Sequence, residues 1–91
     1  MANHASAKKR HRQNLKRRAR NAARQSRVRK SIRLLRQLVA EKQSTAVKQQ
    51  LPLTISEIMR ARSKGVLHWR TARRRVARLS RLANTVLANK S

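Results

Sequence analysis

Apolar residues recur at helical spacing in three stretches of the chain, and these stretches predict three helices. In the first, aliphatic side chains follow one another by four, three and four positions: Val28, Ile32, Leu35 and Val39, with Leu38 alongside. Such steps place side chains on one face of an α-helix. No glycine or proline occurs between Ser6 and Lys42, so we expect one helix over this range, about 55 Å long at 1.5 Å per residue.

The second predicted helix covers Thr45–Ser63. Its apolar face consists of Val47, Leu51, Ile55 and Ile58, together with Met59. Proline removes a backbone donor, so Pro52 should kink or split this helix. Thr54 and Glu57 fit a capping box, which would let the continuous part begin only at Ile55.

The third predicted helix runs from Val66 to Asn89, after a helix stop at Gly65 in the left-handed conformation. Its core stripe advances by three and four positions: Trp69, Ala72, Val76, Leu79, Ala83 and Val86. We expect Trp69 to be the main core anchor, and the alternative is stacking on a base or under an arginine. Four arginines fall almost opposite the stripe on the helical wheel: Arg70, Arg74, Arg78 and Arg81.

These patterns predict an all-α protein, a three-helix bundle whose long, basic first helix extends beyond it. After Met1, Leu15 is the only large aliphatic residue before Val28, so the N-terminal half of the first helix has no face to bury against protein. We therefore expect one domain over residues 1–91, with a basic helical extension or tail at 1–27 and the bundle at 28–91.

Charge decides what the bundle and its extension contact. The chain has 26 Lys and Arg residues against two acids, Glu41 and Glu57, which gives a formal charge of +24 on 91 residues. It cannot balance this charge internally, and a polyanion would supply the missing negative charge. Arginine outnumbers lysine by 18 to 8, and its planar fork suits phosphate. Nucleic acid is the expected partner.

Two groups of residues are candidates for RNA binding. The first lies along the extension: Lys8, Lys9, Arg10, Arg12, Lys16, Arg17, Arg18, Arg20, Arg24 and Arg27. The second lies at the start and on the outer face of the third helix: His68, Arg70, Arg73, Arg74 and Arg78. The alternative is that these charges are only solvated, and that the extension is a disordered tail. A third possibility combines both, with an extension that is frayed when free and helical when bound.

Other function classes have little support in the sequence. The three histidines are scattered, no glycine-rich phosphate loop occurs, and the chain has no cysteine. We therefore expect no enzyme, no metal site, no cofactor and no small-molecule ligand. No apolar run approaches the roughly 18 residues that span a bilayer, and the first residues lack the apolar core of a secretory signal. A membrane partner is not expected.

Two stretches resemble the family of bacterial and organellar small-subunit ribosomal protein number twenty. One comprises Met1-Ala-Asn, Ser6-Ala-Lys-Lys-Arg10, Gln13, Lys16, Arg18, Asn21-Ala22, Arg24, Ser26, Arg29 and Ile32. The other is Lys64-Gly-Val-Leu-His68, leading through Ala72, Arg74 and Ala77 to Leu79. Because Asn21 lies in the first stretch, it joins the candidate RNA-binding residues. Where the family usually has a basic residue and then asparagine after the histidine, this chain has Trp69 and Arg70.

The resemblance implies a three-helix bundle that binds small-subunit ribosomal RNA early in assembly, at the 5′ domain and the long penultimate stem. It implies a ribosome in the bacterial cytoplasm or in an organelle. From the residues alone, an architectural protein of double-stranded DNA stays open, because backbone binding is common to DNA and RNA. A cationic membrane-active peptide would need a strongly apolar face opposite the charge, which the first thirty residues lack.

Overall fold

The computed structural model describes residues 2–87, with side chains for residues 6–87, and this range forms three helices. They are α1 (Ala2–Ala40), α2 (Ser44–Ser63) and α3 (Trp69–Leu87). The all-α prediction is confirmed. α1 begins four residues before its predicted start, and the predicted end of the third helix at Asn89 lies outside the described residues.

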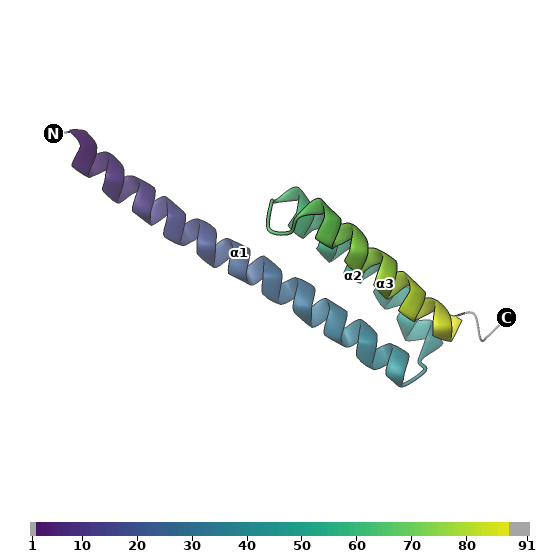
Figure 1. The fold of residues 1–91 in the computed structure, drawn as a ribbon. Coiled ribbons are helices and arrows are strands. Elements are labelled where there is room, and N and C mark those ends of the chain that lie inside the picture. The colour runs from purple at the N-terminus through teal and green to yellow at the C-terminus, as the bar shows by residue number, and fades with distance from the viewer. Residues whose placement is uncertain (1, 88–91) are drawn as a thin grey trace.

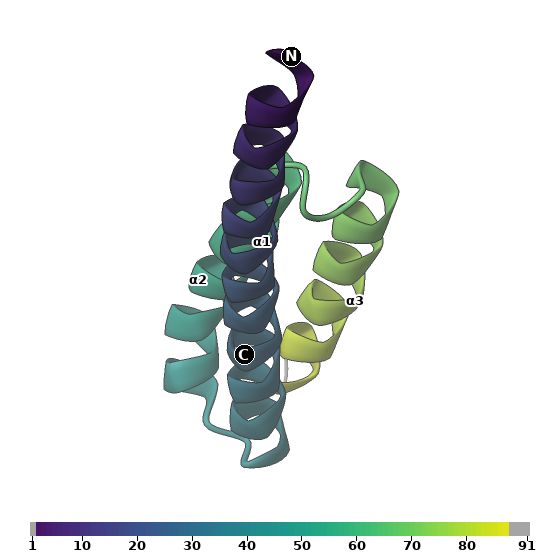
Figure 2. The same cartoon turned by 90° about the vertical axis from the view of Figure 1, so that its left-hand side faces the viewer.

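α1 is about twice as long as its partners, and only its C-terminal half lies beside them (Figure 1). The chain runs along α1, returns along α2 and then runs along α3, so that successive helices are antiparallel. Seen from the end of the extension, α2 and α3 lie on either side of α1 (Figure 2). The molecule measures 70 × 21 × 14 Å. A three-helix bundle with a protruding first helix is the architecture that the pattern predicted.

The core is small and aliphatic. Its buried members are Val28, Leu35 and Val39 of α1, Val47, Ile58 and Ala61 of α2, and Ala72, Leu79, Ala83 and Val86 of α3. The predicted stripe of α1 is confirmed, with Ile32 and Leu38 partly buried against this core. Two predicted core residues are wrong: Met59 is 41% exposed and Trp69 is 47% exposed. Three of the ten buried residues are alanines, so the core is thin.

Helix α2 continues through Pro52, and the predicted split with a restart at Ile55 is wrong. An interior proline costs a helix about 3 kcal/mol. On either side of it, Val47 and Ile58 are fully buried, and each such side chain contributes about 1.5–3 kcal/mol by burial. The proline itself lies on the exposed side of the helix. Tertiary packing therefore outweighs the local preference.

Thr54 is not a helix cap but part of a polar cluster between α1 and α2. It is fully buried, and its hydroxyl lies 3.2 Å from Ser31 Oγ and 3.3 Å from the Ser31 carbonyl oxygen. Gln50 Nε2 donates to both hydroxyl oxygens at 3.1 Å. Glu57, the other half of the predicted capping box, lies instead 3.7 Å from Arg60 on the same helix. The cluster satisfies the polar groups that the two helices bury together.

The first two helices end in the same hydrogen-bonded turn. After α1, Lys42 N–H donates to the Val39 carbonyl and Gln43 N–H to the Leu38 carbonyl, both at 3.0 Å. After α2, Gly65 and Val66 repeat this pattern with carbonyls of the last turn. Both turns need a left-handed residue, which is Lys42 (φ 55°) in the first and Gly65 (φ 76°) in the second. The predicted stop at Gly65 is confirmed. α1 ends at Ala40, two residues before its predicted end, and Lys42 is the left-handed residue of the turn that follows.

Candidate nucleic-acid interface

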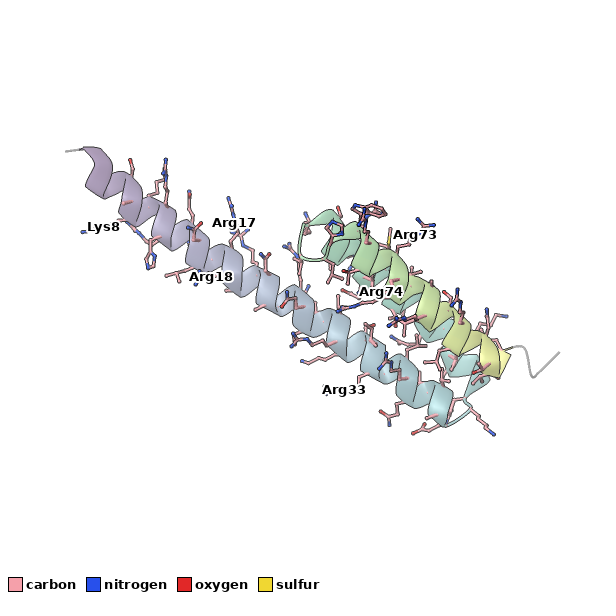
Figure 3. All side chains as sticks on the ribbon, viewed as in Figure 1. Lys8, Arg17, Arg18, Arg33, Arg73 and Arg74 are labelled. Carbon is pink, nitrogen blue, oxygen red and sulfur yellow. The ribbon has the colours of Figure 1, made fainter. Side chains whose placement is uncertain are left out.

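The N-terminal part of α1 carries basic side chains on all sides and touches no other helix. Every described residue from 6 to 20 is exposed. Lys8 and Arg17 point to opposite sides of the helix (Figure 3). Asn21 and Arg24 are half-buried, Arg27 is exposed, and Val28 is the first fully buried residue along the helix. The ten basic candidates of the first group therefore form a surface that winds around a helix, not a patch on one face.

Where α1 joins the bundle, arginines gather in a groove between α1 and α3. Six of them line it: Arg29, Arg33 and Arg36 from α1, and Arg74, Arg75 and Arg78 from α3. The apolar side chains of Ile32 and Leu79 complete the lining, and the groove encloses about 520 Å³. We call this set the arginine groove. In Figure 3, Arg74 extends from α3 toward α1, whereas Arg73 points away.

Arg74 and Arg78 were predicted RNA-binding residues, but their predicted place on the outer face of α3 is wrong, because they line the groove beside α1. The other four arginines of the groove were not predicted. The sequence feature that could have revealed these arginines is their position next to residues of the core stripes. Arg29, Arg33 and Arg36 each follow a stripe residue of α1 by one position, and Arg75 and Arg78 each precede one of α3. One step along a helix turns a side chain by about 100°. These arginines therefore border the buried stripes, on the sides where the two helices approach each other.

The arginine groove has no counter-charge of its own. Among the residues that the structure describes, no carboxylate lines it. Glu57 lies 3.7 Å from Arg60 on α2, and Glu41 accepts a hydrogen bond from Gln37 at 3.3 Å just beyond the end of α1. Six like charges repel in such a space, and a bound anion would relieve the repulsion. Guanidinium groups bind phosphate oxygens bidentately, so a chain of phosphates fits this groove chemically.

The other candidates of the third helix lie outside the arginine groove, around Trp69. His68 precedes the first residue of α3, and its Nδ1 accepts a hydrogen bond from Arg70 N–H at 3.1 Å. Ala72 N–H donates to the His68 carbonyl at 3.0 Å, the first bond of the helix. His68 therefore caps α3, a role that the sequence analysis did not assign to it.

Trp69 is a surface residue, although it follows the spacing of the core stripe. Ala61, near the end of α2, is 1% exposed and Ala72, one turn into α3, is 0% exposed. The ring of Trp69 lies instead against its neighbours, with the His68 ring centroid 5.8 Å away and Arg70 Cζ 5.3 Å from the Trp69 centroid.

Two further features bear on function. No helix between residues 2 and 87 is long and apolar enough to cross a membrane. Over the same range, no three His, Asp or Glu side chains gather into a group that could hold a metal ion.

The comparison with known proteins gives one consistent result. The family model described as ribosomal protein S20 matches residues 2–84. A small ribosomal subunit protein bS20 from Oleidesulfovibrio alaskensis is 42% identical over 86 residues, which cover 94% of this chain and 99% of the relative. The bS20 of Syntrophobacter fumaroxidans is 44% identical over 94% of this chain and 100% of its own length. That of Dinoroseobacter shibae is 41% identical over 97% and 100%.

Proposed function

Because the chain belongs to the ribosomal protein S20 family, we propose that it is a structural constituent of the small ribosomal subunit that binds ribosomal RNA directly through the phosphate backbone. The proposal extends to assembly: the protein stabilises the folded RNA by neutralising phosphates where RNA helices crowd together. It performs no chemistry. The relatives compared are bacterial proteins, which supports the cytoplasmic ribosome of a bacterium as its location.

The observation that carries the proposal is the arginine groove. Six guanidinium groups from two helices converge there, and no carboxylate of the described chain lines the space. A protein that only needed solubility would gain nothing from gathering its charges between two helices. A sugar–phosphate strand, in contrast, has regularly spaced anionic groups and is narrow enough to follow a groove between helices. Several phosphates held there would fix the bundle on the RNA.

The extension of α1 complements this site. Its basic side chains surround the helix, so it can lie between two RNA strands and contact phosphates on both sides. The bundle then anchors the protein on one RNA helix, and the extension bridges to another. By family resemblance, we place these two contacts in the 5′ domain and the long penultimate stem of the small-subunit RNA. Neither contact reads the sequence, since phosphates carry no base information.

A salt titration of RNA binding tests the role of the arginine groove. In the groove variant, Arg33, Arg36 and Arg78 are replaced by Gln. In the matched control, Lys42, Lys48 and Arg60, which lie outside every proposed RNA contact, are replaced by Gln. Each phosphate contact adds about 0.7–0.9 to the slope of log affinity against log salt. We expect the groove variant to lower the slope on small-subunit RNA by about two to three, and the control to leave it nearly unchanged. Equal slopes for both variants would contradict the proposal.

A second measurement tests the partner. On a sucrose gradient of a cell lysate, the protein should sediment with the small ribosomal subunit. Sedimentation with bulk DNA would instead support an architectural DNA-binding protein and would overturn the ribosomal assignment.

A further inference from the structure

The exposed indole of Trp69 lies at the edge of a second groove, on a different side of α3 from the arginine groove. This groove encloses about 470 Å³ between α2 and α3. Its lining combines apolar side chains, which are Met59, Trp69, Val76 and Ala77, with the cationic Arg62 and Arg73. Met59 and Trp69 expose 41% and 47% of their surface. Two large apolar side chains that could have enlarged the thin core are therefore exposed along one groove.

The indole contacts the side chains of both its chain neighbours. The hydrogen bond from Arg70 N–H to His68 Nδ1 ties the histidine to the first turn of α3. The two rings are stacked with an interplanar angle of 28°, and the Arg70 guanidinium lies over the indole with Cζ 5.3 Å from its centroid. The start of α3 thus carries three flat side chains close together. The indole still exposes 47% of its surface, so part of it stays open to a ligand that stacks on it.

We propose that Trp69 receives an unpaired nucleobase of the bound RNA, which stacks on the indole and enters the groove toward Met59. This inference rests on the proposed RNA-binding function and names a contact that backbone binding does not provide. A base has the flat aromatic surface that an indole stacks on, and its flanking phosphates are the anions that Arg62, Arg70 and Arg73 would contact. No carboxylate of the described chain lines this groove, so the surrounding charge favours a nucleic acid over an acid-poor protein segment.

The structure also changes what the protein can do with RNA. Trp69 was expected in the core, with stacking on a base as the alternative, and its exposure favours the alternative. With the indole on the surface, the protein has one position that distinguishes unpaired from paired RNA, since a base within a duplex does not offer its face. The contact would therefore place the start of α3 at a loop, bulge or end of the RNA.

Fluorescence gives a direct test, because Trp69 is the only tryptophan and the chain has no tyrosine. Excitation near the red edge of indole absorption reports on this one residue. We expect small-subunit RNA to quench the emission at stoichiometric binding. A fully paired RNA duplex should bind through its phosphates and leave most of the emission. Equal quenching by both RNAs, or none by either under binding conditions, would overturn the inference.

Substitutions separate this contact from the arginine groove. Trp69→Ala should weaken binding to small-subunit RNA by roughly 5- to 150-fold, the usual effect of losing one stacked base. Trp69→Phe should recover most of the affinity, and Trp69→Leu, apolar but not aromatic, should not. None of the three should change the salt slope, because no phosphate contact is lost.

The possible failures are distinguishable. If Trp69→Ala binds RNA like the unaltered protein while the groove variant still lowers the salt slope, base stacking is wrong and backbone binding stands. If Trp69→Ala binds naked RNA normally but no longer joins the complete subunit, the groove contacts a protein, and the inference is overturned. If neither set of variants affects RNA binding, the proposed function itself fails.

Discussion

The two halves of α1 are both strongly basic, but they differ in their apolar residues and therefore in what holds them as helix. Both are rich in arginine and have good helix formers throughout. In the half that packs in the bundle, Val28, Leu35 and Val39 are buried against α2 and α3. In the extension, residues 6–20 are all exposed, and the helix there projects beyond α2 and α3 (Figure 1). One half of this continuous helix is therefore stabilised by packing in the bundle. The other half has no such packing, and its positive charge is unbalanced within the protein.

Burial is confined to the second half of α1, whereas positive charge runs along the whole helix. An isolated helix of 12 to 15 residues is marginal in water even without repulsion, and like charges four positions apart destabilise it further. Under the proposed function, the order of the extension depends on the RNA that it contacts. In the packed half, the arginines instead project from a backbone that the core already holds in place.

The largest effect should come from the charge of the extension. Replacing Arg10, Arg12, Lys16, Arg17, Arg18 and Arg20 by Gln should lower RNA affinity by orders of magnitude at moderate salt, because as many as six phosphate contacts are lost. The free energy of unfolding of the bundle should stay within about 0.5 kcal/mol, since these side chains touch no other helix. Filter binding and urea denaturation measure the two quantities. An affinity close to that of the unaltered protein would leave the bundle as the whole interface.

Two leucines in α1 give a matched test of burial. Leu35 is 0% exposed and Leu15 is 49% exposed. Leu35→Ala should destabilise the free protein by about 2–5 kcal/mol through lost burial and a residual cavity. Leu15→Ala, the same change on the same helix, should alter the free energy of unfolding by no more than about 0.5 kcal/mol. Similar losses for both variants would show that the extension packs against something in the free protein.

A smaller loss of stability should follow from removing the polar cluster that joins the packed half of α1 to α2. The hydroxyl of Thr54 joins Ser31 of α1 to α2. Thr54→Val keeps the shape but removes the hydroxyl, which should cost about 1–3 kcal/mol by leaving buried polar partners unsatisfied. The triple variant that also carries Ser31→Ala and Gln50→Leu should recover part of that stability, because the partners are removed too. Thermal denaturation compares the two, and a triple variant less stable than Thr54→Val would argue against this account.

The sequence predicted the elements of the fold better than their contacts. The stripe from Val28 to Val39 and the stop at Gly65 follow from local spacing and backbone preference, and both are confirmed. Pro52 was misread because its cost is local, whereas the packing of Val47 and Ile58 that outweighs it is tertiary. A stripe also does not show which of its positions face a neighbouring helix closely enough to be buried, which is why Trp69 was expected in the core.

The candidate interface likewise has one part that the sequence predicted and one part that it did not. A run of basic residues without apolar neighbours is visible in any sequence, so the exposed extension could be predicted. The arginine groove depends on how α1 and α3 are rotated toward each other. Only that rotation brings Arg29 and Arg33 together with Arg75, and the polar cluster of Ser31, Gln50 and Thr54 depends on the same kind of information for α1 and α2. Single-helix periodicity does not contain it.

Amide hydrogen exchange along α1, measured with and without small-subunit RNA, tests the central claim most directly. In the free protein, amides of residues 28–40 should be protected by the bundle, while those of residues 6–20 exchange at rates near those of an unstructured chain. Binding of RNA should protect residues 6–20 strongly and change residues 28–40 far less. Equal protection of both segments in the free protein would contradict the account, because the extension would then be ordered without its polyanion.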